Sequence, residues 1–552
     1  MFVFILSISL RWLVPPNPGY NSLHDDQLLV TLAHNIINDH WLGSYREMGH
    51  LLLSKPPGYS IFLAYTHWLP WAPTVTIHLV LLIGFLLILR EMRLLDFSRG
   101  FCLASFTLFA FYPVWFSETM SRLYRDGLLA ALTTIFVSFA LILRRQIRQS
   151  EKLRNQIPMS FLIGLTAGLF YITKPSWHFL LPIFLGIVFL SDVSAQINDF
   201  AVFRSRLKRG MITLLTASLS FMLLPGYVKM QNEHHYGVFA IDSFSEGGFP
   251  EAMKAIYSAR EPLNRPYIDS TSQARADLYL VSPTMRSLKD FLELPIDQGW
   301  RSQPCHSDLG VCDESGAWFP WEVRDSIQKS GQGDTAEEFE ETSHKIANEI
   351  RSACRKNIII CDNEGLAPGL DSLDTLSLRS LTDSFAKGIQ FLINPATGYQ
   401  ERGEFREVAK ETINVWESTI KGLPPRKFAT KYESNDLFFG DVRKVIIQFY
   451  GALWIPAIFL SIVGLIIRRR GVDKVLSETL RILSLSMLAG ISILILQISM
   501  LQASSGYYMN SGGDLYLLPL HALLLIVVAL GLHRLSLVIL DVVKGAGCTE
   551  SS

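Results

Sequence analysis

The chain has 552 residues, of which 49% are apolar and 18% charged, and its 50 basic and 50 acidic side chains cancel. Soluble proteins usually carry about a quarter charged residues, so this composition favours a membrane protein. Because the sequence has no positive excess, broad electrostatic capture of nucleic acid is not expected.

Long uncharged runs recur along the chain and approach the roughly 20 residues that cross a bilayer core. The first run, Phe2–Val14, contains Arg11 and is followed by Pro15 and Pro16 instead of a small-residue cleavage site, so we interpret it as a membrane helix. The sequence predicts about ten transmembrane helices, and the other nine runs are Thr74–Leu89, Phe101–Phe116, Gly127–Leu143, Met159–Thr173, Trp177–Leu190, Met211–Val228, Val445–Ile467, Ile482–Leu501 and Leu515–Leu532.

The basic residues of the loops predict the orientation, since cytoplasmic loops carry an excess of Lys and Arg. With the N-terminus inside, nineteen basic residues fall on the inner side. Only five lie in the short outer loops: Arg46, Lys55, Arg122, Arg125 and Lys174. A span at Pro57–Pro70 would invert every later loop, so we expect this segment to lie along the outer membrane surface through Tyr59, Phe62, Tyr65 and Trp68.

We therefore expect an all-α polytopic membrane protein with three parts. An N-terminal membrane module covers residues 1–230, an extracytoplasmic domain, α/β or mostly helical, covers 231–443, and a C-terminal membrane module covers 444–552. In the middle part, Asp334-Thr-Ala-Glu-Glu predicts the start of a helix, and Phe405–Ile420 has a second helical pattern.

Four cysteines lie in the polar middle part. Cys305 and Cys312 have the same spacing as Cys354 and Cys361. On the extracytoplasmic side they would meet an oxidising compartment, which favours disulfides. Three connectivities remain open, as does the alternative of four free thiols.

Carboxylates and cations also recur in the short outer loops. The first loop contains Asp25-Asp26 and Lys55-Pro-Pro, and the second contains Arg122, Arg125 and Asp126. Both loops begin and end at the same membrane face. The sequence therefore predicts that these side chains converge there.

These residues also carry a family resemblance. The short first helix with Arg11, the acidic pair, the Trp41-Leu-Gly turn and the Lys55-Pro-Pro box resemble the GT-C polyprenyl-phosphate-sugar glycosyltransferases. The pattern is most similar to the protein O-mannosyltransferase and lipid A aminoarabinose transferase branches, often called family 39, and Gly164–Pro175 is similar to the fifth-helix sequence of that family. The resemblance covers about the first 230 residues. Two departures are Asp25-Asp26, where the family commonly has Asp-Glu, and a large outer insert that puts the acceptor in doubt.

The resemblance implies an inverting glycosyl transfer from a polyprenyl-phosphate sugar to a glycan, lipid or protein acceptor. It implies Asp25 as the general base, Asp26 as its neighbour or alternate, and Asp126 as an acid that shapes the donor or acceptor site. Phosphate would be bound by cations, namely Lys55, Arg122, Arg125 and, as a weaker candidate, Lys174. It also implies a bacterial inner or plasma membrane with the active site on the extracytoplasmic side, whereas the sugar, the acceptor and the need for a divalent cation stay open.

Simpler interpretations compete for the same residues. Asp25 could cap the helix that follows it, and Arg122 and Arg125 could anchor the protein at lipid headgroups. Tyr507 and Tyr508 fit an aromatic belt as well as sugar stacking. The first-loop histidines match no usual metal-ligand spacing, which favours ordinary surface residues: His24, His34, His40 and His50.

Three rival functions stay in view. A transporter would place ionisable groups within its spans, whereas these runs are almost free of them apart from His78. A membrane scaffold would explain the outer domain but not the acidic pair. A lipid-linked glycan ligase or polymerase shares the large outer loop and is the harder rival, because Arg and His occur in that loop.

Overall fold

The computed structural model describes residues 1–17, 24–149, 151–190, 200–259, 270–294, 318–361, 378–393, 409–423, 436–467, 474–505 and 516–547. Within these ranges the protein is all helical, and no β-strand forms. An isolated bridge between extended residues joins Asn17 to Arg122. The α/β alternative for the middle part therefore finds no support in the described residues.

Eight helical segments of the described chain are long and apolar enough to cross a membrane. They are α5 (Pro73–Arg93), α6 (Arg99–Ala110) with η2 (Pro113–Phe116), α8 (Arg125–Arg148), α9 (Leu153–Thr173), α12 (Phe200–Phe221) with α13 (Leu223–Tyr236), α23 (Asp436–Ile466), α24 (Lys474–Ser505) and α26 (Leu518–Gly547). Two shorter apolar segments are α1 (Phe2–Leu13) and η3 (Trp177–Phe179) with α10 (Leu180–Leu185) and η4 (Gly186–Leu190). The ten runs predicted from the sequence fall on these ten segments, which confirms a polytopic membrane protein.

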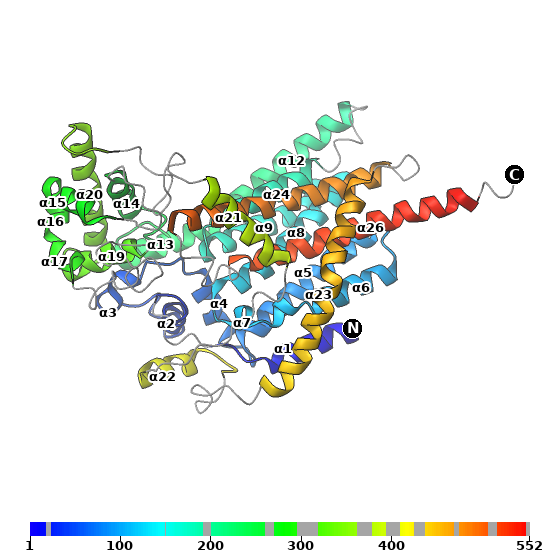
Figure 1. The fold of residues 1–552 in the computed structure, drawn as a ribbon, viewed down its shortest axis with the longest axis horizontal. Coiled ribbons are helices and arrows are strands. Elements are labelled where there is room, and N and C mark those ends of the chain that lie inside the picture. Colours follow the sequence, from blue (N-terminus) through cyan, green and yellow to red (C-terminus); the bar gives the residue numbers. More distant parts are fainter. Residues whose placement is uncertain are drawn as a thin grey trace.

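Helix α8 forms the centre of the membrane bundle. Its apolar stretch is 89% buried inside the protein, against 22% for that of α23. It packs against α5, α9 and α26, and Figure 1 shows it surrounded by the other long helices. A helix that is apolar on all sides is typical of such a central position. The apolar stretch of α8 is therefore enclosed by its neighbours.

Small residues bring α9 and α12 into close contact. A Cβ atom added at Gly164 would lie 2.1 Å from the carbonyl oxygen of Ala217, and one added at Gly168 would lie 2.7 Å from that of Phe221. Small residues four apart commonly allow membrane helices to approach backbone to backbone. The segment Gly164–Gly168, which carries part of the family resemblance, thus has a packing role in this chain.

A second group of helices lies at one end of the bundle (Figure 1). The start of α1 and the end of α26 lie toward the opposite end. It contains α14 (Gly248–Ser258), α15 (Ser272–Val281), α16 (Pro283–Ser287), α17 (Lys289–Leu292), α19 (Phe319–Lys329) and α20 (Ala336–Arg355). These helices share an apolar core of their own that includes Phe249, Leu288 and Ile346. Thr335 and Glu338 form a capping box at the start of α20, as the sequence predicted.

Arg324 of α19 connects this helical group to the first loop. Its guanidinium lies 4.7–4.9 Å from the ring centroids of Phe244, Phe249 and Phe339. It also donates hydrogen bonds to the Ser243 hydroxyl and to the carbonyl oxygen of His50. Burial lowers the pKa of Arg324 to about 10, so it stays charged at neutral pH and is stabilised by these contacts.

The first loop folds into short helices: α2 (Asp26–Ile37), α3 (Tyr45–Met48), η1 (Gly49–Leu51) and α4 (Gly58–Thr66), while α7 (Glu118–Ser121) lies in the second loop. Helix α4 has nine residues and is too short to cross a bilayer, in agreement with the prediction that this segment does not span. Tyr65 and Trp68 are exposed as expected for a surface segment, but the expectation is wrong for Tyr59, which is buried against Leu63 in the core of the bundle.

Two further helices complete the described chain. Helix α21 (Leu378–Ile393) packs on α24, and α22 (Lys410–Thr419) packs on α2. The second contact includes a hydrogen bond of 3.2 Å between His34 Nδ1 and Thr419 Oγ1. Helix α22 covers the described part of the predicted pattern at Phe405–Ile420, whose first residues lie outside the described ranges.

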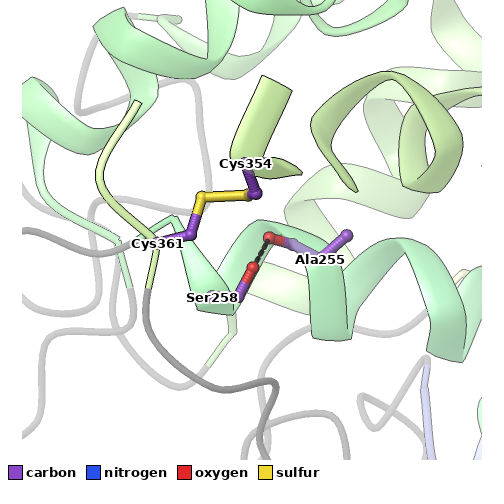
Figure 2. Close-up of a disulfide and its surroundings, with 4 residues drawn as sticks. All are labelled: Ala255, Ser258, Cys354 and Cys361. Atoms are coloured by element: carbon purple, nitrogen blue, oxygen red, sulfur yellow. Dashed lines mark hydrogen bonds between the residues drawn. A yellow bond between two sulfur atoms is a disulfide. The ribbon is translucent and has the colours of Figure 1, made fainter. Parts of the chain in front are cut away.

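Cys354 and Cys361 form a disulfide, which confirms the prediction of at least one bridge. Figure 2 shows Cys354 at the end of α20, Cys361 in the segment that follows, and both near Ala255 and Ser258 of α14. The two cysteines pack against the apolar core of the outer helices. Cys305 and Cys312 lie outside the described residues, and Cys102 is buried as a free thiol.

We expect Cys354→Ser and Cys361→Ser each to lower the free energy of unfolding by about 2 kcal/mol, because the bridge closes a short loop and restricts the unfolded chain. Thermal unfolding of the purified variants, together with peptide mapping under non-reducing conditions, measures this. Cys102→Ser is the matched control and should leave the linked peptide intact. Recovery of Cys354 and Cys361 as free thiols from the unreduced protein would contradict the bridge.

Candidate active site

Asp25 lies at the start of α2 but does not cap it. The residue occupies the N-cap position, yet its side chain accepts no hydrogen bond from the helix backbone. Instead the carboxylate forms an ion pair with Lys55 and accepts a hydrogen bond of 3.1 Å from Tyr124 Oη. The simple capping interpretation of Asp25 is therefore wrong, and the side chain faces the cations of the two loops.

Tyr124 is the residue around which the cations gather, and the sequence analysis missed it. Lys55, Arg122 and Arg125 lie 5.2, 5.0 and 5.2 Å from the centroid of its ring. Burial raises the pKa of Tyr124 well above its ordinary value, so the phenol stays protonated and can donate to Asp25. The only sequence signal was its position between Arg122 and Arg125, because an aromatic ring can hold cations on its face.

Asp26 is fully buried and pairs with Arg122. Arg122 Nε lies 2.9 Å from Asp26 Oδ1 and 2.8 Å from Oδ2, and Nη2 also donates to Oδ2. Burial raises the pKa of Asp26, and Arg122 opposes this by favouring the charged carboxylate. Such a forked contact holds the second loop against α2. Arg122 is 30% exposed and also approaches Asp25 at 3.7 Å, so it is not only an anchor to lipid headgroups.

Asp126 and Lys174 form the second half of the cluster. Lys174 Nζ lies 2.7 Å from Asp126 Oδ1 and 3.9 Å from the centroid of the Tyr516 ring. Asp126 is in the first turn of α8, and Lys174 directly follows α9. The other carboxylate oxygen of Asp126 is buried and has no hydrogen-bond partner among the described residues. It is therefore available to accept a hydrogen bond from a ligand.

Gly58 allows the segment that follows Lys55 to pack closely against the end of α9, which directly precedes Lys174. A Cβ atom added at Gly58 would lie 2.7 Å from the carbonyl oxygen of Ile172 and 2.6 Å from Thr173 Oγ1. Only a residue without a side chain lets the Lys-Pro-Pro segment lie directly on the end of α9. Lys55 and Lys174 are thereby presented from adjacent segments of backbone.

Burial and charge set the protonation states of the cluster. Burial by itself raises the pKa of Asp25, but Lys55, with smaller effects of Arg122 and Arg125, lowers it to about 2. Burial lowers the pKa of Lys55 to about 8 against the opposing effect of Asp25, and lowers that of Lys174 to about 8 against that of Asp126. At neutral pH Asp25 is thus charged, and both lysines are close to losing their protons.

Arg125 is the cation with spare hydrogen-bonding capacity. Its Nε is buried and makes no hydrogen bond within the described residues. Among the described residues the cluster brings together four basic side chains and three carboxylates: Lys55, Arg122, Arg125 and Lys174 with Asp25, Asp26 and Asp126. A cluster of this kind can attract an anionic group while keeping a carboxylate beside it.

The remaining candidates lie elsewhere. Tyr507 and Tyr508 lie outside the described residues. Three of the four first-loop histidines have different packing partners: His24 packs on Trp321, His34 contacts Thr419, and His50 contacts Gln328. Among the described residues, no group of three or more His, Cys, Asp or Glu side chains is arranged to hold a metal ion.

The outer helices reach the edge of the cluster. His24 directly precedes Asp25 in the chain, and the centroid of its ring lies 4.7 Å from that of Trp321. Trp321 in turn contacts Phe244, which lies over Arg324. These contacts place an aromatic wall, formed by Trp321 and Phe244 of the polar middle part, against His24, the residue before Asp25. Sequence patterns alone did not indicate this wall.

No protein-family model and no curated protein matches the chain. Among solved structures, the chain is similar to ArnT from Cupriavidus metallidurans in the apo state, with 12% identity over 96% of this chain and 75% of that one and a TM-score of 0.30. The same protein bound to undecaprenyl phosphate matches with 11% identity over 97% and 76% and a TM-score of 0.27.

We expect Arg122→Gln to destabilise the protein by roughly 3 kcal/mol, because it leaves the carboxylate of Asp26 buried without its charged partner. Thermal unfolding in detergent should show a lower Tm, and adding Asp26→Asn to Arg122→Gln should recover part of the loss. Arg46→Gln, at an exposed position of the same loop system, is the control. Equal Tm values for Arg122→Gln and Arg46→Gln would contradict the structural role of the pair.

Proposed function

We propose that this chain is an integral membrane glycosyltransferase that moves a sugar from a polyprenyl-phosphate donor to an acceptor at the extracytoplasmic face. The observation that carries the proposal is the carboxylate of Asp25, held by Lys55 and Tyr124 in a cluster that also contains Arg122 and Arg125. Glycosyl transfer from a lipid phosphate needs both a base and cations for the departing phosphate. The sequence resemblance to GT-C transferases points in the same direction.

In this mechanism the acceptor hydroxyl attacks the anomeric carbon of the donor sugar. A new carbon–oxygen bond forms on one face while the bond to the phosphate oxygen breaks on the other, so the configuration inverts. The acceptor proton passes to Asp25, and the phosphate leaves as polyprenyl phosphate. Arg125 and Lys174 are proposed to bind the phosphate, since Arg125 Nε has no hydrogen-bond partner among the described residues and Lys174 lies at the C-terminal end of α9.

Lys55 is proposed to pair first with Asp25 and then with the donor phosphate. In the resting site it pairs with Asp25 and keeps the pKa of that carboxylate at about 2, far below the value that suits a base at neutral pH. When the donor phosphate binds, it competes with Asp25 for the Lys55 ammonium. The carboxylate then becomes more basic in the complex that contains the donor.

Asp26 and Asp126 are proposed to act differently from Asp25. Asp26 is committed to Arg122 and positions the two loops. Asp126 holds Lys174 through one oxygen and can orient the donor or the acceptor through the other. The domain proposed for residues 231–443 would approach the acceptor through the wall that includes Trp321.

The rival functions fit the described contacts less well. A transporter would use its intramembrane ionisable groups, but His78 is engaged with Ser7, and Arg11 donates to Ser121 and to the Trp115 carbonyl oxygen. A glycan ligase would use Arg and His of the large outer loop. Arg324 of that loop is enclosed by three aromatic rings. A scaffold would need no paired carboxylates at the membrane face.

The base assignment predicts that Asp25→Asn lowers turnover by about 10²–10⁴-fold while the protein still folds and still binds the donor. The amide keeps the size of the side chain but cannot accept the proton. The measurement is transfer by purified protein from a lipid-phosphate sugar to a cell-envelope extract. Asp39→Asn, at the other end of α2 with a positive φ of 59° that Asn also tolerates, is the control. Near-normal transfer by both Asp25→Asn and Asp26→Asn would remove the base assignment.

The lysine pKa values predict the pH dependence. As the pH rises through about 8, Lys55 and Lys174 lose their charge, phosphate binding weakens, and kcat/KM for the donor should fall. Asp25 stays ionised down to a pH of about 2 and should give no acid limb at moderate pH. Lys174→Arg should move the alkaline limb to higher pH, whereas Lys229→Arg, outside the cluster, should not. An unchanged limb in both Lys174→Arg and Lys55→Arg would refute this origin.

A further inference from the structure

A tight turn within residues 237–247 connects α13 of the membrane bundle to α14 of the outer helices. The carboxylate of Asp242 accepts hydrogen bonds of 3.0 and 2.9 Å from the backbone N–H groups of Phe244 and Ser245. Contacts of this kind between an Asp side chain and the nearby backbone define the shape of a turn. The direction in which Ser243 points is therefore set within the turn itself.

Ser243 holds the segment that leads to Lys55. Its backbone N–H donates a hydrogen bond of 2.8 Å to the carbonyl oxygen of Leu53, and its hydroxyl donates one of 2.9 Å to the same oxygen. Both residues are buried, and a buried carbonyl group needs such partners. Lys55 lies two residues after Leu53, and Pro56 restricts its backbone from the other side. The position of the Leu53 carbonyl thus determines where the backbone of Lys55 lies.

Arg324 of α19 orients the Ser243 hydroxyl. Its Nη1 donates a hydrogen bond of 2.8 Å to Ser243 Oγ, so the hydroxyl proton is directed to another acceptor, which is the oxygen of Leu53. The Nη2 of Arg324 donates to the carbonyl oxygen of His50 in the same first loop. Three aromatic rings surround the guanidinium and limit its movement. The outer helices therefore act on the Lys55 segment through Ser243.

The same turn also contacts the end of α9. Glu246 accepts a hydrogen bond of 3.2 Å from the hydroxyl of Tyr171, and Ile241 shares a small buried apolar cluster with Ile172. Tyr171 and Ile172 are in the last turn of α9, directly before Lys174. One turn of the chain is thus in contact with the segments that carry both lysines of the candidate site.

We propose that Ser243 is a positioning residue of the donor site: it holds the Lys55 segment in place for the phosphate, and α19 supports it through Arg324. This role rests on the proposed function, in which Lys55 binds the donor phosphate. A cation that is fixed before binding loses less conformational freedom when the phosphate arrives. The outer helices thereby contribute to the donor site without touching the donor.

Ser243→Ala tests the proposal, because it removes the hydroxyl and keeps the backbone N–H that also binds Leu53. The affinity of the full chain for a purified polyprenyl phosphate without sugar, measured in detergent through the rise in Tm, should fall about fivefold, as expected for one hydrogen bond. The variant should still fold, which non-reducing peptide mapping of the Cys354–Cys361 bridge checks.

The protonation of Lys55 provides a second measurement. Its pKa, taken as the pH midpoint of acetylation by acetic anhydride with detection by mass spectrometry, should rise in Ser243→Ala from about 8 toward the ordinary value. Burial is the largest cause of the low pKa, and a loosened segment admits water. The variant keeps the titratable and charged groups that surround Lys55: His24, Asp25, Asp26, Arg122, Tyr124 and Arg125.

Ser245→Ala is the matched control. Ser245 lies in the same turn, and its hydroxyl donates to Asp242. This variant loses a hydroxyl hydrogen bond of the same kind and should change neither the affinity for polyprenyl phosphate nor the pKa of Lys55. Equal values in Ser243→Ala and Ser245→Ala would overturn the positioning role.

Arg324→Lys decides the question if Ser243→Ala does not fold. Lysine keeps the positive charge among the aromatic rings but lacks the fork that holds Ser243 and His50 together, so the pKa of Lys55 should rise in the same direction. This pKa is measured without a donor. A chain that shows the pKa shift but binds no polyprenyl phosphate even as wild type would contradict the proposed transferase and support the positioning of Lys55. A pKa shift in Ser243→Ala with unchanged affinity would overturn the role of Ser243 in the donor site.

Discussion

Charges removed from water at the boundary of a membrane must compensate one another, and this constraint organises the candidate site. Asp26 and Asp126 are fully buried, and an isolated carboxylate in such a position would cost several kcal/mol. Each is held by one basic residue, Arg122 or Lys174. These pairs join parts of the chain that are far apart in sequence, so the same interactions that make the buried acids tolerable also bring the two outer loops together.

The membrane architecture was predictable because hydropathy and loop charge act locally. The convergence of the outer acids and cations also followed from the order of the spans. The partners did not: Lys55 pairs with Asp25 rather than remaining free, and Lys174 lies on Tyr516. Tyr124 was missed because its role depends on three cations that reach its ring from different segments. Such contacts are set by tertiary packing, which no periodicity in the sequence reports.

Helix α8 connects the two ends of the molecule. Its first turn carries Arg125 and Asp126, and its last turns carry Arg144, Arg145 and Arg148. Since the helix is enclosed by α5, α9 and α26 along its length, it cannot tilt without disturbing its neighbours. The acid and the cation at its first turn are thus supported by the same element that packs against α26.

The absence of a side chain at Gly58 determines how closely two segments of the site approach each other. The Lys-Pro-Pro segment can lie against Ile172 and Thr173 only because nothing projects from this position. Lys55 and Lys174 are therefore carried by two segments of backbone that lie in direct contact. In the proposed transferase, the backbone positions of these two cations would be set during folding, before the donor binds.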